Sequence, residues 1–173
     1  ILHDEKDFHA LRCKVGFVLQ HADDQLFFPT VLEDVAFGPL NLDFSAAEAE
    51  EQARATLQRL GLSGFEQRLT HHLSGGEKKL VALATVLAME PEALLLDEPT
   101  NDLDQDARQR LIDILCDLPT ALMVISHDWD FLSRVCGEYR TIREGHLLAC
   151  APDVRHSHEH VHPLGGEPHW HLP

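Results

Sequence analysis

An apolar strand that ends in two adjacent acids limits the folds open to this sequence. Residues Ala93–Leu96 are uniformly apolar, as in strands buried in parallel sheets, and Asp97 and Glu98 follow them directly. Two neighbouring acids at the end of a buried strand repel each other, so they indicate a cation or a proton-transfer reaction. Mg²⁺ with a triphosphate would satisfy both acids. The alternative is that they merely begin a solvated turn before Pro99.

A glycine-rich helix start precedes this strand. Residues Leu73–Glu77 read LSGGE, and the two glycines let backbone amides approach a ligand at the positive end of a helix, where phosphate binds. Ser74 and Glu77 also match a capping box, which is a purely structural device. A helix from Ser74 to Pro91 leads into the strand at Ala93. This order of elements favours a ligand site over an isolated cap.

Strands and helices alternate along most of the chain, which predicts an α/β fold with a mainly parallel sheet. The other predicted elements are a buried strand at Val15–Leu19, a helix from the Ser45–Glu48 capping box to near Gly61, a helix capped by Asp104, a buried strand at Ala121–Ile125, and a hairpin of Tyr139–Ile142 with His146–Ala149. Ala53, Leu57 and Leu60 share one stripe of the first of these helices and should be buried. Aromatic residues and prolines predict turns between Asp23 and Leu42.

The composition excludes several classes of protein. The 173 residues are 44% hydrophobic, which is enough for one ordinary buried core. A formal net charge of -15 repels a phosphate backbone, so we expect no nucleic acid partner. The four cysteines lack C-x-x-C spacing and predict neither a disulfide framework nor a thiolate metal site. No apolar run approaches the roughly 20 residues that span a bilayer, so any membrane role should be peripheral.

Three motifs carry a resemblance to a known family. They are LSGGEKK at 73–79, LLLDEPTNDLD at 94–104 and VISHD at 124–128. In sequence and order they resemble the ATP-binding cassette (ABC) ATPases, and the likeness runs from Val15 to about Cys150. The resemblance implies a P-loop NTPase-like core with a mainly parallel sheet. It also implies an ABC ATPase domain over residues 1–150, with a helical subdomain at about residues 40–90.

The resemblance further implies that the chain binds ATP with Mg²⁺. Leu73–Glu77 resemble the signature motif, which contacts the terminal phosphate of a nucleotide held by the opposite ATPase subunit. Two chains, identical or different, would therefore build each site. The residues with an implied nucleotide contact are Leu73, Ser74, Gly75, Gly76, Glu77, Asp97 and Asp104. The last of these ends the segment Asn101–Asp104, which resembles the loop that crosses the dimer interface.

Catalytic roles are implied for Glu98, His127 and Gln20. Glu98 resembles the general base that orients and polarises the attacking water, and Asp97 resembles the acid that holds Mg²⁺ through water. His127 resembles the switch histidine that hydrogen-bonds the transferred phosphoryl group, although a histidine after an apolar strand is otherwise more often structural. Gln20 matches the glutamine that senses Mg²⁺ and the attacking water. Asp97 and Gln20 are thus the implied Mg²⁺ site.

A narrower resemblance concerns the transported substrate. The stretch Asp24–Leu40 is similar to energy-coupling-factor and cobalt or nickel importers, and Glu77 is a signature variant associated with the metal-importer branch. We therefore predict the ATP-binding subunit of a transporter that couples ATP hydrolysis to the import of nickel or cobalt. It would lie peripherally at the cytoplasmic face of the membrane, with a transmembrane subunit and a second ABC ATPase subunit as partners. Phe27, Phe28 and Phe37 are either ordinary core or an exposed pocket for a coupling helix.

Two alternative functions fit the same motifs. One is a soluble cassette ATPase outside transport, and the other is a non-catalytic metal-binding or regulatory partner that lends its signature motif to a complete cassette. The phosphate loop G-x-x-x-x-G-K-[ST] occurs nowhere in the 173 residues. We therefore expect a fold that is incomplete at its amino terminus, through truncation rather than degeneration. Negligible ATPase activity from the chain alone should follow.

The segment 151–173 lacks periodic apolar residues and is predicted to be a flexible tail. Its alternating histidines are His156, His158, His160, His162, His169 and His171. Imidazole binds Ni²⁺, Co²⁺ and Zn²⁺ well, so the tail is a candidate chelator. A purification tag is the alternative, but tags are usually uninterrupted histidine runs, whereas these are interleaved with other residues.

Overall fold

The chain divides into two compact units, Ile1–Cys136 and Gly137–Pro173. The computed structural model describes residues 4–150, so the predicted histidine tail at 151–173 lies outside the described residues. No helix within residues 4–150 is both long enough and apolar enough to cross a membrane.

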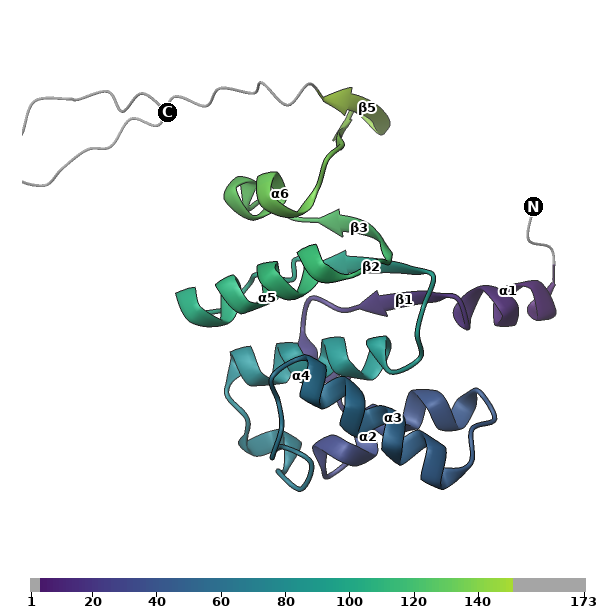
Figure 1. Cartoon of the computed structure of the whole chain (residues 1–173). Helices are drawn as coiled ribbons and strands as arrows, with labels where there is room; N and C mark the ends of the chain where they lie inside the picture. Colours follow the sequence, from purple (N-terminus) through teal and green to yellow (C-terminus); the bar gives the residue numbers. More distant parts are fainter. Residues whose placement is uncertain (1–3, 151–173) are drawn as a thin grey trace, which may run out of the picture. The chain divides into compact units, whose positions relative to one another are not determined.

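A three-stranded parallel sheet forms the centre of the first unit (Figure 1). Its strands are β1 (Val15–Val18), β2 (Ala93–Asp97) and β3 (Ala121–Ile125), in the order β1-β2-β3. The register pairs Val18 with Leu96 and Asp97 with Ile125, so all three strands end at the same edge of the sheet. The predicted α/β fold with a parallel sheet is confirmed.

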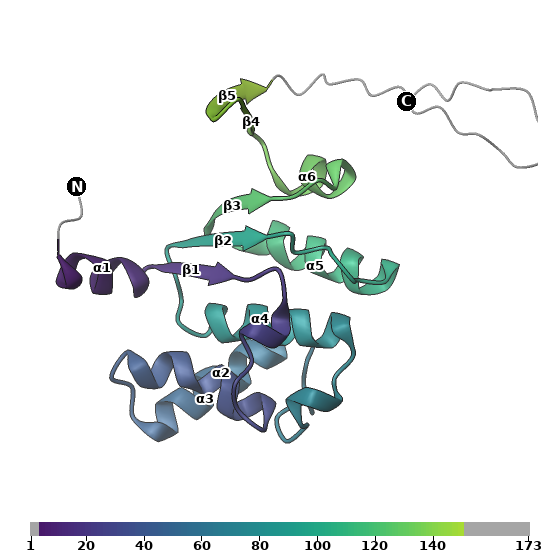
Figure 2. The same ribbon diagram turned by 180° about the vertical axis from the view of Figure 1, so that it is seen from behind.

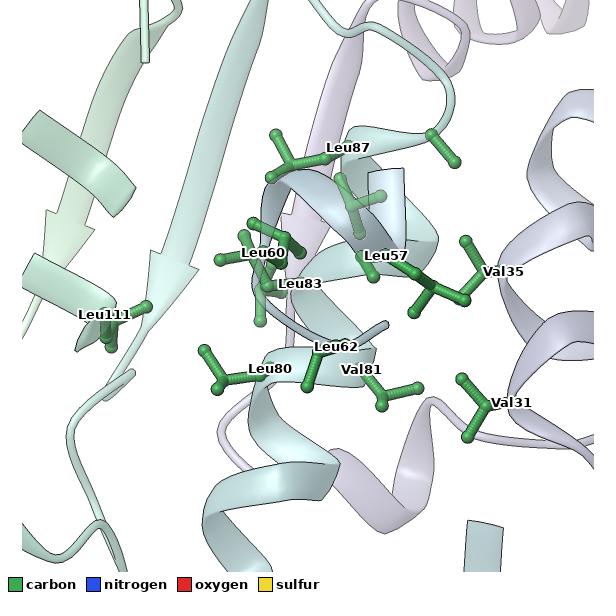
Figure 3. Packing of buried hydrophobic residues seen from close by; sticks show 14 of the residues in the cluster. Val31, Val35, Leu57, Leu60, Leu62, Leu80, Val81, Leu83, Leu87 and Leu111 are labelled. Carbon is green, nitrogen blue, oxygen red and sulfur yellow. The ribbon is translucent and has the colours of Figure 1, made fainter. Parts of the chain in front are cut away.

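Helices α2 (Val31–Asn41) and α3 (Ala46–Arg59) pack on α4 (Gly75–Leu87), which lies between them and the sheet (Figures 1 and 2). Side chains from all three helices interlock in the core (Figure 3). The predicted stripe of α3 is fully buried there, with Ala53 and Leu57 at 0% exposure. The boundaries of a helical subdomain at about residues 40–90 stay a prediction.

Capping boxes begin each of these three helices. Thr30 with Glu33, Ser45 with Glu48, and Ser74 with Glu77 make the reciprocal hydrogen bonds that satisfy the first backbone amides. The last two boxes were expected, and both helices begin where predicted.

Helix α2 corrects the prediction of turns between Asp23 and Leu42. Pro39 gave a false signal, because it lies within the helix, in its last turns, rather than before its start. The residues Thr30 and Glu33 match the capping-box pattern and were the signal that could have revealed α2. A short helix α1 (Glu5–Arg12) was also not predicted.

The strand β3 is less buried than its apolar sequence predicts. It pairs with β2 on one side, and no further strand pairs with it among residues 4–150. Met123 and Ile125 are therefore 58% and 54% exposed. Helices α5 (Gln105–Asp117) and α6 (Trp129–Val135) precede and follow this strand, and α5 buries Leu111, Ile112 and Leu115 as expected.

The described part of the second unit is an antiparallel hairpin of β4 (Tyr139–Arg143) and β5 (His146–Cys150). Its turn residues Glu144 and Gly145 have φ angles of 50° and 77°. Two successive positive φ angles are typical of the two-residue turns that join hairpins. The predicted hairpin is confirmed.

Candidate functional site

The carboxyl edge of the parallel sheet gathers the predicted catalytic residues. Gln20 lies two residues beyond β1, Glu98 one residue beyond β2, and His127 two residues beyond β3. The register continues past the strands, because the Glu98 amide donates to the Ile125 carbonyl at 2.8 Å. Ligand crevices of open parallel sheets form at this edge. The structure therefore places residues from three distant segments of the chain on one edge.

Glu98 is the most constrained of these residues. Its Oε1 lies 2.9 Å from His127 Nδ1, and its Oε2 accepts a hydrogen bond from Ser126 Oγ at 3.2 Å. Its backbone φ of 43° lies in the left-handed region, which is strained for a residue with a side chain. The backbone bond to Ile125 and the side-chain contacts with Ser126 and His127 thus hold Glu98 at the end of β2. A carboxylate in this position can accept a proton from a water at the open edge.

His127 is mostly exposed, and its pKa is raised above the usual range by the hydrogen bond to Glu98 and by the charge of that carboxylate. An exposed imidazole next to the base can donate a hydrogen bond to an anionic ligand. The bond to Glu98 engages Nδ1, so the ring is oriented with its other nitrogen turned away from Glu98.

A bound nucleotide and its Mg²⁺ fit these residues in part. Asp97 ends β2 half-buried, and Gln20 is exposed just beyond β1, the strand next to β2, so both residues would be available to a cation at this edge. Within residues 4–150 no group of three or more histidine, cysteine or acidic side chains forms a metal site. Asp97 would therefore share a cation with phosphate oxygens and water, as Mg²⁺ sites for nucleotides do. The sequence holds no phosphate-loop motif to complete the cradle.

The signature residues form the start of α4. The Ser74 amide donates to Glu77 Oε2 at 2.8 Å, and Ser74 Oγ accepts from the Glu77 amide at 3.3 Å. Arg68 donates to the other carboxylate oxygen of Glu77 at 3.0 Å. The Ser74 amide is the largest cause of the lowered pKa of Glu77. The structural cap is therefore real, and it leaves Ser74 exposed at the positive end of the helix.

The second signature glycine, Gly76, lets α4 lie close to α5. A Cβ at Gly76 would lie 3.0 Å from the Cβ of Ala107, on the first turns of α5. Leu73 is buried and anchors the start of the motif, whereas Gly75 is exposed. Asp104 caps α5 by accepting the Ala107 amide at 2.8 Å. Asp104 thus has a structural role here, and its predicted nucleotide contact stays a prediction.

An ion-pair cluster holds the segment that follows His127 against α5. Arg108 donates from Nε and one terminal nitrogen to the two oxygens of Asp128, each at 2.9 Å, and also pairs with Asp130 at 2.8 Å. Arg108 is the largest cause of the lowered pKa of Asp128. Asp128 directly follows His127 and caps α6. Arg108 was not predicted from the sequence, because an arginine on a helix is usually exposed to solvent and gives no signal by itself.

Lys79, the last residue of the LSGGEKK motif, had no predicted role of its own, and it proves to be a buried cation. It is 4% exposed, and its Nζ donates to the Gln20 carbonyl at 2.5 Å. Burial lowers the pKa of Lys79 below its usual value. The charges of Asp102, Asp97 and Glu98 oppose this decrease. The available signal was a lysine at a position where the helix pattern requires an apolar residue.

A cavity of about 360 Å³ opens between β1, the loop after it, and helices α2 and α4. Its walls are mostly apolar and include Phe17, Phe27, Phe37 and Met89, with Gln25 and Asp34 among the polar residues. Phe27 is 74% exposed and Phe37 is 44% exposed. The reading of these two residues as ordinary core is therefore wrong. Phe28 is partly buried and packs against Phe37 with the two rings tilted by 46° and their centroids 5.1 Å apart.

The six predicted tail ligands, His156 to His171, lie outside the described residues, so their metal site stays a prediction.

Known proteins resemble the chain along most of its length. The family model described as ABC transporter matches residues 1–101. A putative ABC transporter ATP-binding protein of Nitratidesulfovibrio vulgaris is 57% identical over 171 residues, which cover 99% of this chain and 62% of that protein. The energy-coupling factor transporter ATP-binding protein EcfA of Methanothermobacter thermautotrophicus is 48% identical over 150 residues, or 85% of this chain and 48% of that protein. The chain thus spans about half to two thirds of these relatives.

Solved structures give the same picture. The cbiO1 protein of Clostridium perfringens, described as part of the ABC transporter complex cbiONQ, superposes with a TM-score of 0.76 at 34% identity, covering 84% of this chain and 59% of that one. The ATP-binding cassette MJ0796, dimeric with ADP and Pi, superposes with a TM-score of 0.71 at 26% identity, covering 86% of this chain and 68% of that one.

Proposed function

The chain belongs to the ABC transporter ATPase family, and on that premise we propose that it serves in an ATP-binding subunit whose ATP hydrolysis drives the import of nickel or cobalt. One observation carries the catalytic part of the proposal. Glu98, at the end of β2, is fixed by Ser126 and His127 at the edge where a parallel sheet binds its ligands.

In this proposal each residue at the edge has a separate task. Glu98 accepts a proton from the attacking water, and His127 hydrogen-bonds the phosphoryl group as charge develops on it. Asp97, through water, and Gln20 would hold Mg²⁺, which neutralises phosphate charge when bound. The raised pKa of His127 supports its role as a hydrogen-bond donor to an anion.

The signature motif would act on a nucleotide held by a second ATPase subunit. Ser74 is exposed at the positive end of α4, where backbone amides and the helix dipole favour phosphate. The similarity to a dimeric cassette structure supports a two-chain site. The second subunit would supply the phosphate loop that is absent from these 173 residues.

A transmembrane subunit is the other proposed partner. The apolar cavity beside the loop after β1, with exposed Phe27 and Phe37 on its wall, is suited to receive a short helix of that partner at the cytoplasmic face of the membrane. Metal import is supported by the likeness of Asp24–Leu40 to cobalt and nickel importers. The similarity to an energy-coupling factor transporter ATP-binding protein and to a protein of an ABC transporter complex supports the coarser role of a transporter subunit.

Complementation tests the two-chain site. A complete cassette subunit of this family whose own signature serine is replaced by arginine should hydrolyse little ATP, and adding the present chain should restore activity by supplying Ser74. Ser74→Arg in the present chain should remove the restored activity by at least about tenfold, since each 1.4 kcal/mol of lost stabilisation is a factor of ten. Ser63→Arg, in an exposed loop, is the matched control and should leave it unchanged. Restoration by the Ser74 variant would refute the proposed site.

Uptake measurements test the cargo. Cells that lack the ATP-binding subunit containing this chain should accumulate less radiolabelled Ni²⁺ or Co²⁺ than cells that express it, and a copy of that subunit with Glu98→Gln should not restore the uptake. Equal accumulation with and without the chain would contradict metal import while leaving the ATPase proposal intact.

A further inference from the structure

We infer that Lys79 is a positioning residue for Gln20, whose backbone it ties to helix α4 through a buried hydrogen bond. The inference deepens the proposed function, on which the catalytic role of Gln20 rests. It assigns a role in the site to a lysine that neither contacts the reacting atoms nor belongs to the surface.

The geometry around the Lys79 ammonium supports this role. Nζ donates to the Gln20 carbonyl at 2.5 Å and approaches the Leu19 carbonyl at 3.5 Å. The residue is 4% exposed, and a buried lysine is unfavourable unless its hydrogen-bond donors and charge are satisfied. Backbone carbonyls of one short loop accept the hydrogen bonds, and the carboxylates at the sheet edge balance the charge. Because burying a lysine is unfavourable, its presence here indicates that the fold depends on its hydrogen bonds to the loop.

Gln25, at the other end of the same loop, also connects the loop to α4. Its Oε1 accepts from the Leu19 amide at 3.1 Å, while its Nε2 donates to the Ala82 carbonyl at 2.8 Å and to Thr85 Oγ1 at 2.9 Å. Both polar atoms of the amide are therefore used, one toward the loop and one toward α4. Lys79 therefore extends from α4 to the loop, and Gln25 extends from the loop to α4.

The contacts on α4 share one side of the helix. Positions 79, 82 and 85 follow each other at spacings of three, which places them in one row. Lys78 adds a pair with Asp23 at 2.6 Å, but Asp23 is 75% exposed, so this pair contributes little.

The brace has a mechanical consequence. The loop Leu19–Gln25 is fixed to the helix that begins with the signature serine, Ser74. A displacement of α4 when Ser74 meets a nucleotide would displace the Gln20 backbone with it. The position of Gln20 relative to Asp97 and Glu98 would then depend on the position of α4, without any contact between Ser74 and Gln20.

Amide hydrogen exchange of the intact chain tests the brace directly and requires no ATP. Four amides at the loop make internal hydrogen bonds and serve as probes: Leu19, Asp24, Gln25 and Leu26. In Lys79→Met these amides should exchange at least tenfold faster, while amides of β2 and β3 keep their rates. Lys79→Arg or Lys79→Gln, which retain a donor, should keep the loop closer to wild type than Lys79→Met does. Lys14→Met breaks an exposed pair with Glu92 and is the matched control, with unchanged loop rates.

Two results would overturn the inference. The first is loop exchange within twofold of wild type in Lys79→Met. The second is equal acceleration in the loop and in β2 and β3, together with no recovery in either donor-bearing variant, because a purely packing role predicts that pattern. If Lys79→Met does not fold, Gln25→Leu is measured instead, and unchanged exchange at Leu19 would overturn the brace. Failure of the ATPase complementation beside a positive exchange result would instead refute the proposed function and leave the brace standing.

Discussion

At the scale of single residues, Glu98 combines a strained backbone with an exposed histidine partner. Its left-handed φ turns the chain immediately after β2, so the carboxylate faces the end of β3 instead of continuing along the strand. The motif predicted this residue as a base. The conformation that fixes it depends on the next strand, which lies far away in the sequence and cannot be derived from local pattern.

The pair gives a prediction for pH dependence. Glu98→Gln removes the carboxylate whose hydrogen bond and charge raise the pKa of His127, so the His127 pKa should fall toward the ordinary value of about 6.5. A group with a raised folded pKa contributes stability below its unfolded pKa and loses it as pH rises through the folded pKa. Wild type should therefore gain stability over the variant as pH falls through 7 toward 6. Histidine NMR titration checks the pKa, and denaturant unfolding checks the stability.

The control for this prediction is Glu138→Gln, which alters an exposed pair with Arg140 in the hairpin. Its titration curve for His127 should match wild type. An unchanged His127 pKa in Glu98→Gln would show that the 2.9 Å contact does not form in solution.

Asp34 is a second residue whose burial has a measurable consequence. It is 3% exposed, its Oδ1 accepts the amides of Phe27 and Phe28, and its Oδ2 has no hydrogen-bond partner within residues 4–150. Burial raises its pKa. Since the folded state then favours the protonated acid, wild-type stability should fall relative to Asp34→Asn as pH rises above about 4. Urea unfolding from pH 3.5 to 7 measures the difference, with exposed Asp117→Asn as the control. A pH-independent difference would contradict it.

At the scale of helices and strands, sequence predicted most where its signal was local. The capping boxes at Ser45 and Ser74 lie within four residues, and both helices begin there. Helix α2 was missed because Pro39 was interpreted as a turn residue and the capping box at Thr30 was not recognised. The apolar sequence of β3 predicted burial, but burial depends on which strands flank it, and that is a property of the whole sheet.

The candidate site followed the same rule. Motif order predicted Gln20, Glu98 and His127, and the parallel register explains why they share one edge. The supporting residues Arg108 and Lys79 could not be predicted, because their roles come from tertiary contacts with segments about 20 and 60 residues away. Sequence therefore predicted the candidate catalytic residues better than the residues that support them.

The link between α5 and α6 gives a prediction about stability. Arg108→Met removes a two-point bond to Asp128 in which both side chains are about a quarter exposed, and leaves that carboxylate without its cation. The free energy of unfolding should fall by about 1 to 3 kcal/mol. Arg54→Met, which breaks an exposed pair with Glu50 on α3, should change it by less than about 0.5 kcal/mol. Equal effects of the two substitutions, measured by urea unfolding, would contradict the structural importance of Arg108.

At the scale of the whole chain, the proposed metal chelation by the tail is separable from the ATPase fold. The intact chain should bind Ni²⁺ or Co²⁺ more tightly than a chain ending at Pro152, because only the intact chain holds the alternating histidines. Binding should weaken below pH 6.5, since coordination needs neutral imidazole. Calorimetric titration of both chains is the measurement. His71→Ala with His72→Ala is the control and should keep the affinity of the intact chain, whereas equal affinity of the two chains would exclude the tail.

Within residues 4–150, the outer side of β3 pairs with no strand, and this has a consequence for the isolated chain. Its outer row of amides and carbonyls is a template on which another extended segment can hydrogen-bond, and the exposed side chains of Met123 and Ile125 would add apolar contact to that pairing. The chain therefore carries a route to self-association along the outer strand of its parallel sheet. Self-association of this kind rises with protein concentration, so concentration should govern how much of the chain remains free to pair with a partner.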